Sequence, residues 1–105
     1  MNKFIDNKSL TRVIDKYKKN NQKIVLCHGV FDVLHSGHIL HFREAKKYGE
    51  ILIVSITADK FIYKGPNRPF YNLEQRMKII SEISIVDFVI PSLEATAISN
   101  LSFIR

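Results

Sequence analysis

The chain has 105 residues, which suits one domain with a modest core and is too short for two independent domains. Hydrophobic residues make up 46% and charged residues 25% of the sequence, close to the average of soluble globular proteins, which excludes a disordered or fibrous class. No apolar run approaches the ~20 residues that cross a bilayer. Residues 1–6 also lack the apolar middle of a signal peptide. We therefore expect a cytoplasmic protein without a membrane partner.

The formal net charge of +6 points to anionic partners. The lysines and arginines are spread along the whole chain, however, and the aromatic residues lack the interleaved pattern of a single-strand binder. This distribution favours phosphorylated small molecules over nucleic acid. Cys27 is the only cysteine, which excludes an intrachain disulfide and a cysteine-based zinc site.

An apolar stripe near the N-terminus predicts the first helix. Ser9 is a suitable N-cap, and Asn20 and Asn21 end the pattern. Between them, apolar side chains recur at helical spacing, at Leu10, Val13, Ile14 and Tyr17. We expect this helix to serve as scaffold.

A strand, a loop, a helix and a second strand follow. Residues 23–28 are β-branched and apolar on both faces, as in a strand buried in a parallel sheet. Residues 36–48 carry apolar side chains on one side, and Gly49 is placed as the C′ residue of that helix. Residues 51–56 form the second apolar strand. Such a βαβ unit has a right-handed crossover, and ligands lie beyond the carboxyl ends of its strands.

The next segment, residues 57–69, is a polar connection that is too long for a tight turn. Long loops at the carboxyl edge of a sheet usually carry function. Asn72 and Gln75 have the spacing of a capping box at the start of a third amphipathic helix. Residues 85–90 then predict a third strand.

The last residues predict a short helix over 94–101 and the beginning of another strand at 103–104. The expected fold is therefore α/β: a Rossmann-like, three-layer α/β/α arrangement with a mostly parallel sheet, in a single domain over residues 1–105. The abrupt end suggests truncation at the C-terminus.

The loop after the first strand contains the chemistry. Residues 27–38 read Cys-His-Gly-Val-Phe-Asp-Val-Leu-His-Ser-Gly-His. His35 and His38 stand where the helix begins, and its unpaired backbone N–H groups favour an anion. Gly37 removes a side chain where a phosphate would approach, and Gly29 allows the strand end to pass near a nucleotide. We expect a nucleoside triphosphate to bind there.

Residues 29–38 resemble the H-x-G-H motif of the cytidylyltransferase-like nucleotidyltransferases. Residues 57–61, 64–69 and 74–76 resemble the sugar-phosphate branch, most closely the heptose 1-phosphate adenylyltransferase domain and glycerol-3-phosphate cytidylyltransferase. The similarity covers roughly residues 22–92. It implies that a phosphate oxygen of a phosphorylated sugar or polyol attacks the α-phosphate of ATP or CTP, releasing pyrophosphate, with Mg²⁺ present and no covalent enzyme intermediate. It also implies a homodimer.

The resemblance assigns residue roles by position. Transition-state stabilisation falls to His35 and His38, and neutralisation of phosphate charge on the acceptor side to Lys64. Nucleotide binding is implied for Gly29, Val30, Phe31, Ser36, Gly37 and Lys46. Supporting roles, in organising the loops and bracing the site from the third helix, are implied for Asp32, Asp59 and Arg76.

The sequence departs from the family in residues 93–105, where members have a further strand and a second nucleotide-binding segment with an arginine and an Ile-Ser-Thr-Thr-like helix start. Nothing there matches that segment. We therefore expect either a fragment or a partner that supplies the missing part. The alternative function is a nucleotide-binding or assembly module that has lost turnover.

Simpler interpretations exist for individual residues. A metal site is conceivable because His41 continues the three-residue spacing that starts at His35, but no carboxylate or cysteine completes a tetrahedral set. Lys64 can belong to a surface turn, and Lys46 to a charged helix face. His28 is interpreted as a structural residue that closes its strand.

Overall fold

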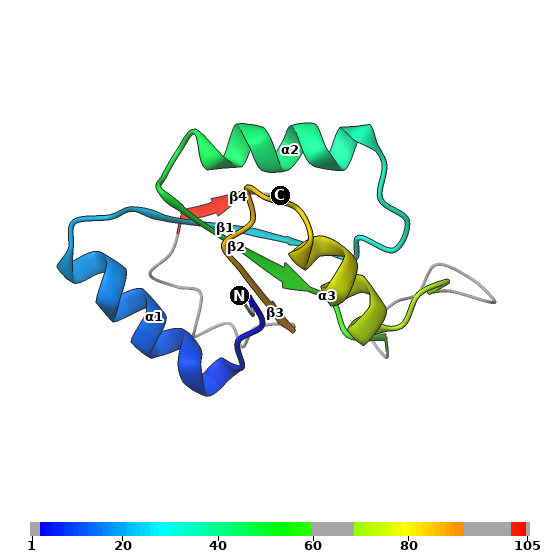
Figure 1. Ribbon diagram of the computed structural model, residues 1–105, viewed down its shortest axis with the longest axis horizontal. Coiled ribbons are helices and arrows are strands. Elements are labelled where there is room, and N and C mark those ends of the chain that lie inside the picture. Colours follow the sequence, from blue (N-terminus) through cyan, green and yellow to red (C-terminus); the bar gives the residue numbers. More distant parts are fainter. Residues whose placement is uncertain (1–2, 60–68, 92–101, 105) are drawn as a thin grey trace.

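A computed structural model describes residues 3–59, 69–91 and 102–104 of the chain. In this part, four strands form one parallel sheet in the order β3-β2-β1-β4 (Figure 1). The strands are β1 Ile24–Gly29, β2 Ile51–Ile56, β3 Phe88–Pro91 and β4 Ser102–Ile104. The helices are α1 Asn7–Lys19, α2 Ser36–Lys46 and α3 Leu73–Ser81. None of the described helices is long and apolar enough to span a membrane.

The order of the strands confirms the predicted βαβ unit. β1 and β2 pair in parallel, from Ile24 opposite Ile51 to Gly29 opposite Ile56, and α2 connects them. β3 adds to the far side of β2, whereas β4 pairs with β1 on its other side. The sheet thus grows outward in both directions from β1 and β2. The loop after β1 lies at the carboxyl edge, next to this switch in direction, where doubly wound sheets bind their ligands.

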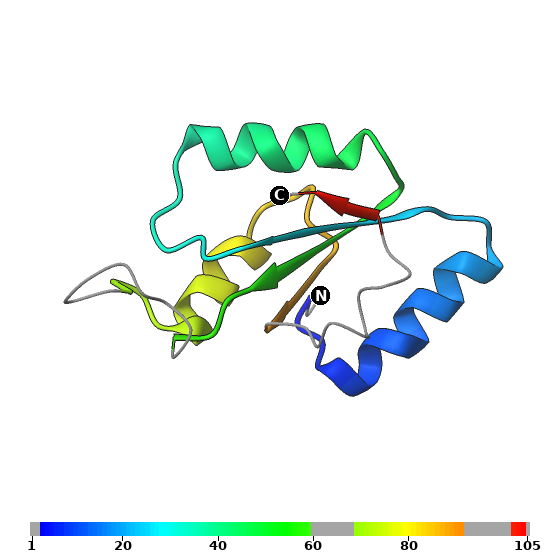
Figure 2. The ribbon, with the colours of Figure 1, turned by 180° about the vertical axis from the view of Figure 1, so that it is seen from behind.

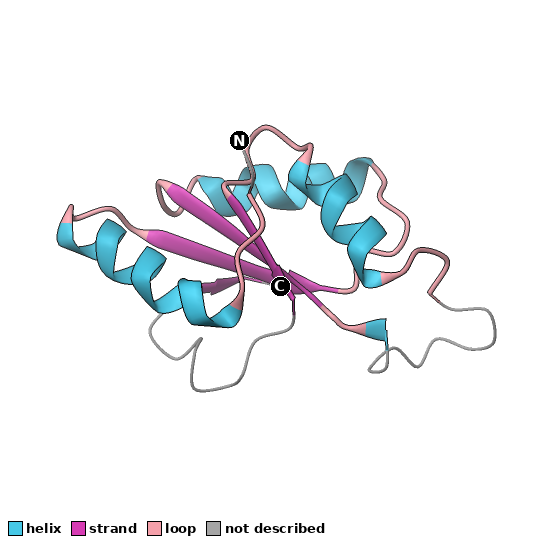
Figure 3. Cartoon of the chain, turned by 60° about the horizontal axis from the view of Figure 1, so that its bottom comes forward, coloured by secondary structure: helices cyan, strands magenta, loops and turns pink. Residues whose placement is uncertain are grey.

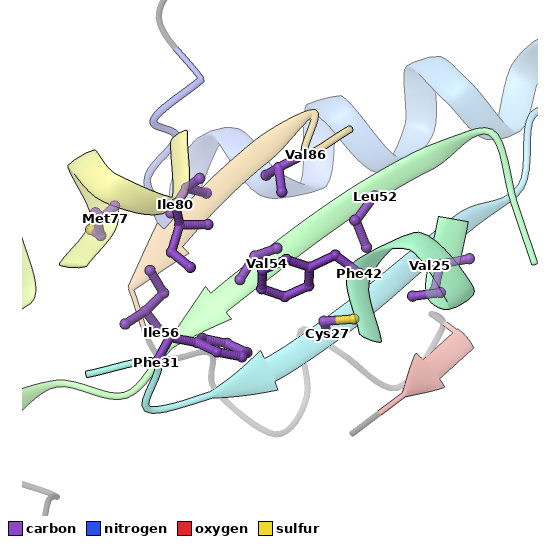
Figure 4. Packing of buried hydrophobic residues seen from close by; sticks show 12 residues of the cluster. Val25, Cys27, Phe31, Phe42, Leu52, Val54, Ile56, Met77, Ile80 and Val86 are labelled. Carbon is purple, nitrogen blue, oxygen red and sulfur yellow. The ribbon is translucent and has the colours of Figure 1, made fainter. Parts of the chain in front are cut away.

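Side chains of the two central strands alternate between two apolar cores. Val25 and Cys27 belong to the core under α2 and α3, together with Phe42 (Figure 4). Ile24 and Leu26 face the opposite way, into a core that α1 covers. Figure 3 shows α1 on one side of the sheet and the other two helices on the other side. The predicted three-layer Rossmann-like fold is therefore confirmed.

The start of α1 differs from the prediction. Asp6, not Ser9, is the N-cap, and its carboxylate accepts a hydrogen bond from the Ser9 backbone N–H at 2.7 Å. That hydrogen bond holds the pKa of Asp6 below its ordinary value. The prediction was wrong because an apolar stripe locates the buried face of a helix, whereas the first turn before it carries no such signal.

Gly49 also has a different role from the predicted one. The cap of α2 is Lys47, so Gly49 is not the C′ residue. A Cβ on Gly49 would lie 2.7 Å from the Lys23 carbonyl oxygen and 2.8 Å from a Val25 methyl group. The glycine is needed because the chain passes against the start of β1 at this point.

The ends of the sheet complete the comparison. β3 begins at Phe88, three residues later than predicted, and β4 agrees with the strand predicted at 103–104. Residues 3–5 cover the outer edge of β3, because the Val89 N–H donates to Lys3 O and the Ile5 N–H to Val89 O. The helix predicted over 94–101 lies outside the described residues.

Candidate functional site

The loop between β1 and α2 has a constrained backbone. Phe31 adopts a left-handed conformation with φ 50°, which is unfavourable for a residue with a side chain. Its ring is buried, 5.2 Å from the ring of Phe42 and edge-on to that of His38 at 5.6 Å. A Cβ on Gly29 would lie 2.7 Å from the Phe31 ring. Gly29 therefore makes room for this ring, and its contact with a nucleotide stays a prediction.

His35 and His38 form a capping box at the start of α2. His35 is the N-cap, and its Nδ1 accepts a hydrogen bond from the Gly37 N–H at 3.0 Å. The Nδ1 of His38 accepts one from the His35 N–H at 3.2 Å. The two rings lie side by side, with centroids 4.0 Å apart and planes at 37°.

These contacts determine which nitrogen of each ring carries the proton. A ring nitrogen that accepts a hydrogen bond is unprotonated, so the proton of a neutral imidazole must be on Nε2. His35 and His38 therefore present two Nε2–H donors beside each other. They stand at the N-terminus of α2, where the helix dipole also favours an anion. Such an arrangement can bind phosphate oxygens and stabilise the charge that develops on them.

Gly37 contributes to this geometry through the ring of His35. A Cβ on Gly37 would lie 2.8 Å from His35 Cε1 and 3.0 Å from its Nδ1. A side chain at position 37 would thus clash with the His35 ring, and the Gly37 N–H donates to that ring in the cap. The approach of a phosphate to Gly37 stays a prediction. Ser36, next to it, is exposed at the first position of the helix.

α3 has the same capping geometry with different residues. Asn72 is its N-cap and accepts from the Gln75 N–H at 2.9 Å, while Gln75 accepts from the Asn72 N–H at 3.1 Å. This confirms the predicted capping box. Asparagine and glutamine are common at these two positions, whereas histidine is not among the favoured N-caps. Capping alone therefore does not explain why α2 has His35 and His38 there.

Arg76 connects the backbone segments around the site. Its side chain is fully buried, and its guanidinium donates to the carbonyl oxygens of Val30 at 3.0 Å, Thr57 at 2.6 Å and Tyr71 at 2.9 Å. It also forms an ion pair with Asp59. One side chain thus connects the loop after β1, the end of β2 and the segment before α3.

Asp32 makes a second connection between loops. Its two carboxylate oxygens accept hydrogen bonds from the backbone N–H groups of Phe70 at 2.8 Å and Tyr71 at 2.9 Å. The loop after β1 and the segment before α3 lie at the same end of the molecule in Figures 1 and 2. The structure therefore brings together ten of the twelve predicted site residues, and these are Gly29, Val30, Phe31, Asp32, His35, Ser36, Gly37, His38, Asp59 and Arg76.

Lys46 is not brought to this group. It lies at the last residue of α2, about 16 Å along the helix from His35. There it forms an ion pair with Asp87, whose carboxylate also accepts from the Leu52 N–H at 2.7 Å near the start of β2. These contacts belong to the amino edge of the sheet. Lys64, the other predicted phosphate-binding lysine, lies outside the described residues.

Two further features of the carboxyl edge come from the structure. His28 lies with its Nδ1 2.9 Å from Ser55 Oγ and its Nε2 3.5 Å from Thr57 Oγ1, in agreement with a structural role at the end of β1. The exposed rings of Phe70 and Tyr71 were missed, although two adjacent aromatic residues directly before a helix cap were a visible signal. In the described ranges no three metal-ligand side chains gather into a site.

Residues 26–99 match the sequence pattern of the cytidylyltransferase-like family, so the chain belongs to that family. This confirms the resemblance drawn from the H-x-G-H motif. The chain is 43% identical over 95 residues to the bifunctional protein HldE of Blochmanniella pennsylvanica, and 34% identical over 95 residues to the HldE of Sulfurimonas denitrificans. Each alignment covers 89% of this chain and 20% of the relative, so the chain spans about a fifth of their length.

Two solved structures resemble the fold. A lipopolysaccharide core biosynthesis protein from Thermoplasma volcanium superposes with a TM-score of 0.64 and 35% identity, over 70% of this chain and 61% of that one. The pantoate-beta-alanine ligase of Francisella tularensis, crystallised with a β-γ ATP ligand and β-alanine, also has a TM-score of 0.64. The superposition covers 96% of this chain and 39% of the ligase, but at 24% identity it supports the fold alone.

Proposed function

We propose that this chain is a nucleotidyltransferase domain, which transfers AMP or CMP from a nucleoside triphosphate to a phosphorylated sugar or polyol and releases pyrophosphate. The observation that carries the proposal is the pair of imidazoles at the start of α2, whose Nδ1 atoms both accept backbone hydrogen bonds. In each ring Nδ1 accepts the hydrogen bond of the helix cap, so Nε2–H is the hydrogen-bond donor of that ring. The cap of α3 has no such pair.

In the proposed reaction, an oxygen of the acceptor phosphate attacks the α-phosphorus of the nucleotide. The new P–O bond forms while the bond to the pyrophosphate breaks, and the pyrophosphate leaves with that electron pair. The reaction needs little covalent help from the protein, because positioning and charge stabilisation lower its barrier. The Nε2–H groups of His35 and His38 donate to the phosphate oxygens on which charge accumulates.

The remaining proposed roles follow the contacts of each residue. The backbone at Val30 and Phe31 lines the nucleotide and is held in place by the Arg76 guanidinium. Asp32 and Asp59 hold the neighbouring loops through their own hydrogen bonds. Lys64 is retained as a phosphate-binding residue on the acceptor side from the family resemblance alone.

Mg²⁺ is proposed to arrive with the triphosphate. Magnesium is usually held by one or two carboxylates together with substrate phosphates and water. In the described part of the chain Asp32 and Asp59 already bind backbone and guanidinium groups, and no cluster of three ligands exists. The fit is thus to an ion held mainly by the nucleotide. Its chemistry would be to neutralise phosphate charge.

The relatives support a sugar phosphate as the acceptor and ATP as the nucleotide. The HldE proteins match 83% to 91% of this chain, and the motif resembles the heptose 1-phosphate adenylyltransferase domain. CTP is kept as the second nucleotide, because no described residue has been assigned to the base.

The test exploits the two capping boxes. His35→Asn and His38→Gln give α2 the residue pair that caps α3, so helix stability should change by no more than ~0.5 kcal/mol. Both variants lose the imidazole ring, and the amide NH₂ that remains beside the capping oxygen is a donor at a different position from the imidazole Nε2–H. We expect ATP binding by calorimetry, and pyrophosphate release with a panel of sugar 1-phosphates, to fall at least about tenfold in each variant.

His35→Ala and His38→Ala serve as comparisons, because they remove the cap and the donor together and should reduce stability as well as binding. If the Asn and Gln variants bind ATP as tightly as the native chain, the histidine site is wrong. Histidine-dependent ATP binding without pyrophosphate release would favour the alternative of a nucleotide-binding module.

A further inference from the structure

The backbone of Phe70 and Tyr71 is fixed at the carboxyl edge of the sheet. Both N–H groups donate to the carboxylate of Asp32, at 2.8 Å and 2.9 Å. The Tyr71 carbonyl oxygen accepts a hydrogen bond from Arg76 Nε at 2.9 Å. Three hydrogen bonds to two charged side chains thus hold this dipeptide, and the Asn72 cap of α3 follows directly.

The side chains on this fixed backbone are nevertheless exposed to solvent. Phe70 is 60% exposed and Tyr71 is 40% exposed. Val33, next to Asp32 in the loop after β1, is 49% exposed. The rings of Phe70 and Tyr71 contribute little to the apolar cores of the fold. Exposed aromatic groups on a rigid support are typical of a binding surface, because little conformational entropy is lost when a ligand contacts them.

The aromatic pair lies within reach of the histidines. Asp32 contacts the pair directly, and His35 is three positions further along the chain, which limits the distance between the Cα atoms of Asp32 and His35 to about 11 Å. Figures 1 and 2 show the loop after β1 and the segment before α3 at the same end of the sheet. The aromatic pair and the histidines therefore lie at the same end of the sheet and are connected through the loop that contains Asp32.

The aromatic pair lies on the side of β1 that we assign to the acceptor, not on the side that we assign to the nucleotide. Arg76 connects Tyr71 to Thr57, at the end of β2, so the aromatic pair belongs to the β2 side of β1. β4 pairs with β1 on the opposite side. Nucleotides in doubly wound sheets lie where the strand order reverses, which here is between β1 and β4. The β2 side is then left for the second substrate.

We propose that Phe70 and Tyr71 bind the carbon skeleton of the acceptor, with the C–H face of its sugar ring against the aromatic rings, while its phosphate lies near His35 and His38. Sugar rings have an apolar C–H face that packs on aromatic side chains, and the Tyr71 hydroxyl can also bond a ring hydroxyl. This assignment rests on the proposed function and adds residues that select the acceptor.

The experiment measures acceptor binding by calorimetry on the 105-residue chain saturated with a non-hydrolysable ATP analogue. The probes are α-D-mannose 1-phosphate, which has a ring, and inorganic phosphate, which has none. We expect Phe70→Ala and Tyr71→Ala each to raise the Kd for mannose 1-phosphate about three- to tenfold, and to leave the Kd for phosphate and for the ATP analogue unchanged.

Tyr48→Ala is the matched control, because Tyr48 is 59% exposed and lies just beyond the far end of α2. It should leave all three Kd values unchanged. Phe70→Leu and Tyr71→Leu keep apolar volume without a flat ring and should weaken mannose 1-phosphate binding similarly, so an unstable alanine variant does not prevent the test. Phe70→Tyr keeps a flat ring and should therefore have the native Kd for mannose 1-phosphate.

The outcomes separate this inference from the proposed function. Suppose that the native chain binds the ATP analogue and mannose 1-phosphate, and that the Phe70 and Tyr71 variants bind these two ligands with the same Kd values. The acceptor site is then elsewhere, and the nucleotidyltransferase proposal stands. Weaker binding of the ATP analogue in these variants would move the aromatic pair to the nucleotide and overturn the inference. So would failure of the ATP-loaded native chain to bind mannose 1-phosphate. Loss of ATP binding in the native chain would instead contradict the proposed function.

Discussion

His35 and His38 illustrate how a single atom determines the chemistry of a residue. The motif predicts two imidazoles at the start of α2, but not which nitrogen of each takes part in the helix cap. Hydrogen bonds to the Gly37 and His35 N–H groups occupy Nδ1 in both rings and leave the proton on Nε2. The spacing of the histidines was visible in the sequence, whereas their tautomer depends on the folded helix start.

Arg76 is a second residue whose role depends on the fold. Arg76→Met should remove four hydrogen-bonding partners at once and leave the carbonyl oxygens of Val30, Thr57 and Tyr71 without their donor. We expect the free energy of unfolding to fall by about 2–4 kcal/mol, measured by urea denaturation. Lys78→Met, an exposed change on the same helix, is the control and should cost less than ~0.5 kcal/mol. Equal effects of the two changes would contradict the bracing role.

Cys27 gives a prediction about pH. Burial raises the pKa of the Cys27 thiol from 9.0 to about 11, because the thiolate would lose its hydration in the core. Its contribution to stability is therefore complete below pH 9 and is lost as pH rises toward 11, since only the unfolded chain ionises there. The free energy of unfolding of the native chain relative to Cys27→Ala should fall by about 1 kcal/mol per pH unit in this window. A difference that is independent of pH between 9 and 11 would contradict the burial argument.

At the scale of elements, the two ends of α2 have separate functions. Its N-terminus carries the histidine cap, and its C-terminus is attached to the amino edge of the sheet by the Lys46–Asp87 ion pair. The sequence placed both lysine and histidines on one helix and suggested that both contact phosphate. An eleven-residue helix keeps its ends too far apart for that.

The turn after α2 provides a test of packing between elements. Gly49→Ala should lower the free energy of unfolding by about 1–3 kcal/mol, because its Cβ would meet the Lys23 carbonyl oxygen at 2.7 Å and cannot be accommodated without moving β1. Chemical denaturation measures the change. Lys47→Ala, an exposed substitution in the same turn, is the control. A Gly49→Ala chain as stable as the control would show that the turn relaxes at little cost.

For the whole molecule, one sheet is shared by two cores. Leu10 packs α1 on one face, and Phe42 packs α2 on the other. Leu10→Ala should cost about 2–5 kcal/mol and Phe42→Ala about 3–5 kcal/mol. Because β1 and β2 contribute to both cores, each change should lower the unfolding midpoint of all the helices together, as followed by hydrogen exchange. Local opening of α1 alone in the Leu10 variant would contradict a single cooperative domain.

Much of this fold could be predicted from pattern alone, and the reason is the distance over which each feature acts. The apolar strands around Cys27 and Val54, the Asn72 capping box and the H-x-G-H loop are local in sequence, so periodicity and spacing reveal them. The start of α1 was predicted wrongly because its N-cap, Asp6, lies outside the apolar repeat.

The tertiary structure decided what depends on residues far apart in the chain. Gly49 was expected to end a helix, yet it makes room for the Lys23 carbonyl oxygen and the Val25 side chain, which only the fold brings close. The contacts of Arg76 with Val30 and of Asp32 with Phe70 join segments about forty residues apart. The sequence alone determined the parallel α/β fold and the two histidines, because both follow from local pattern. Which side chains surround those histidines was determined by loop contacts at the carboxyl edge of the sheet.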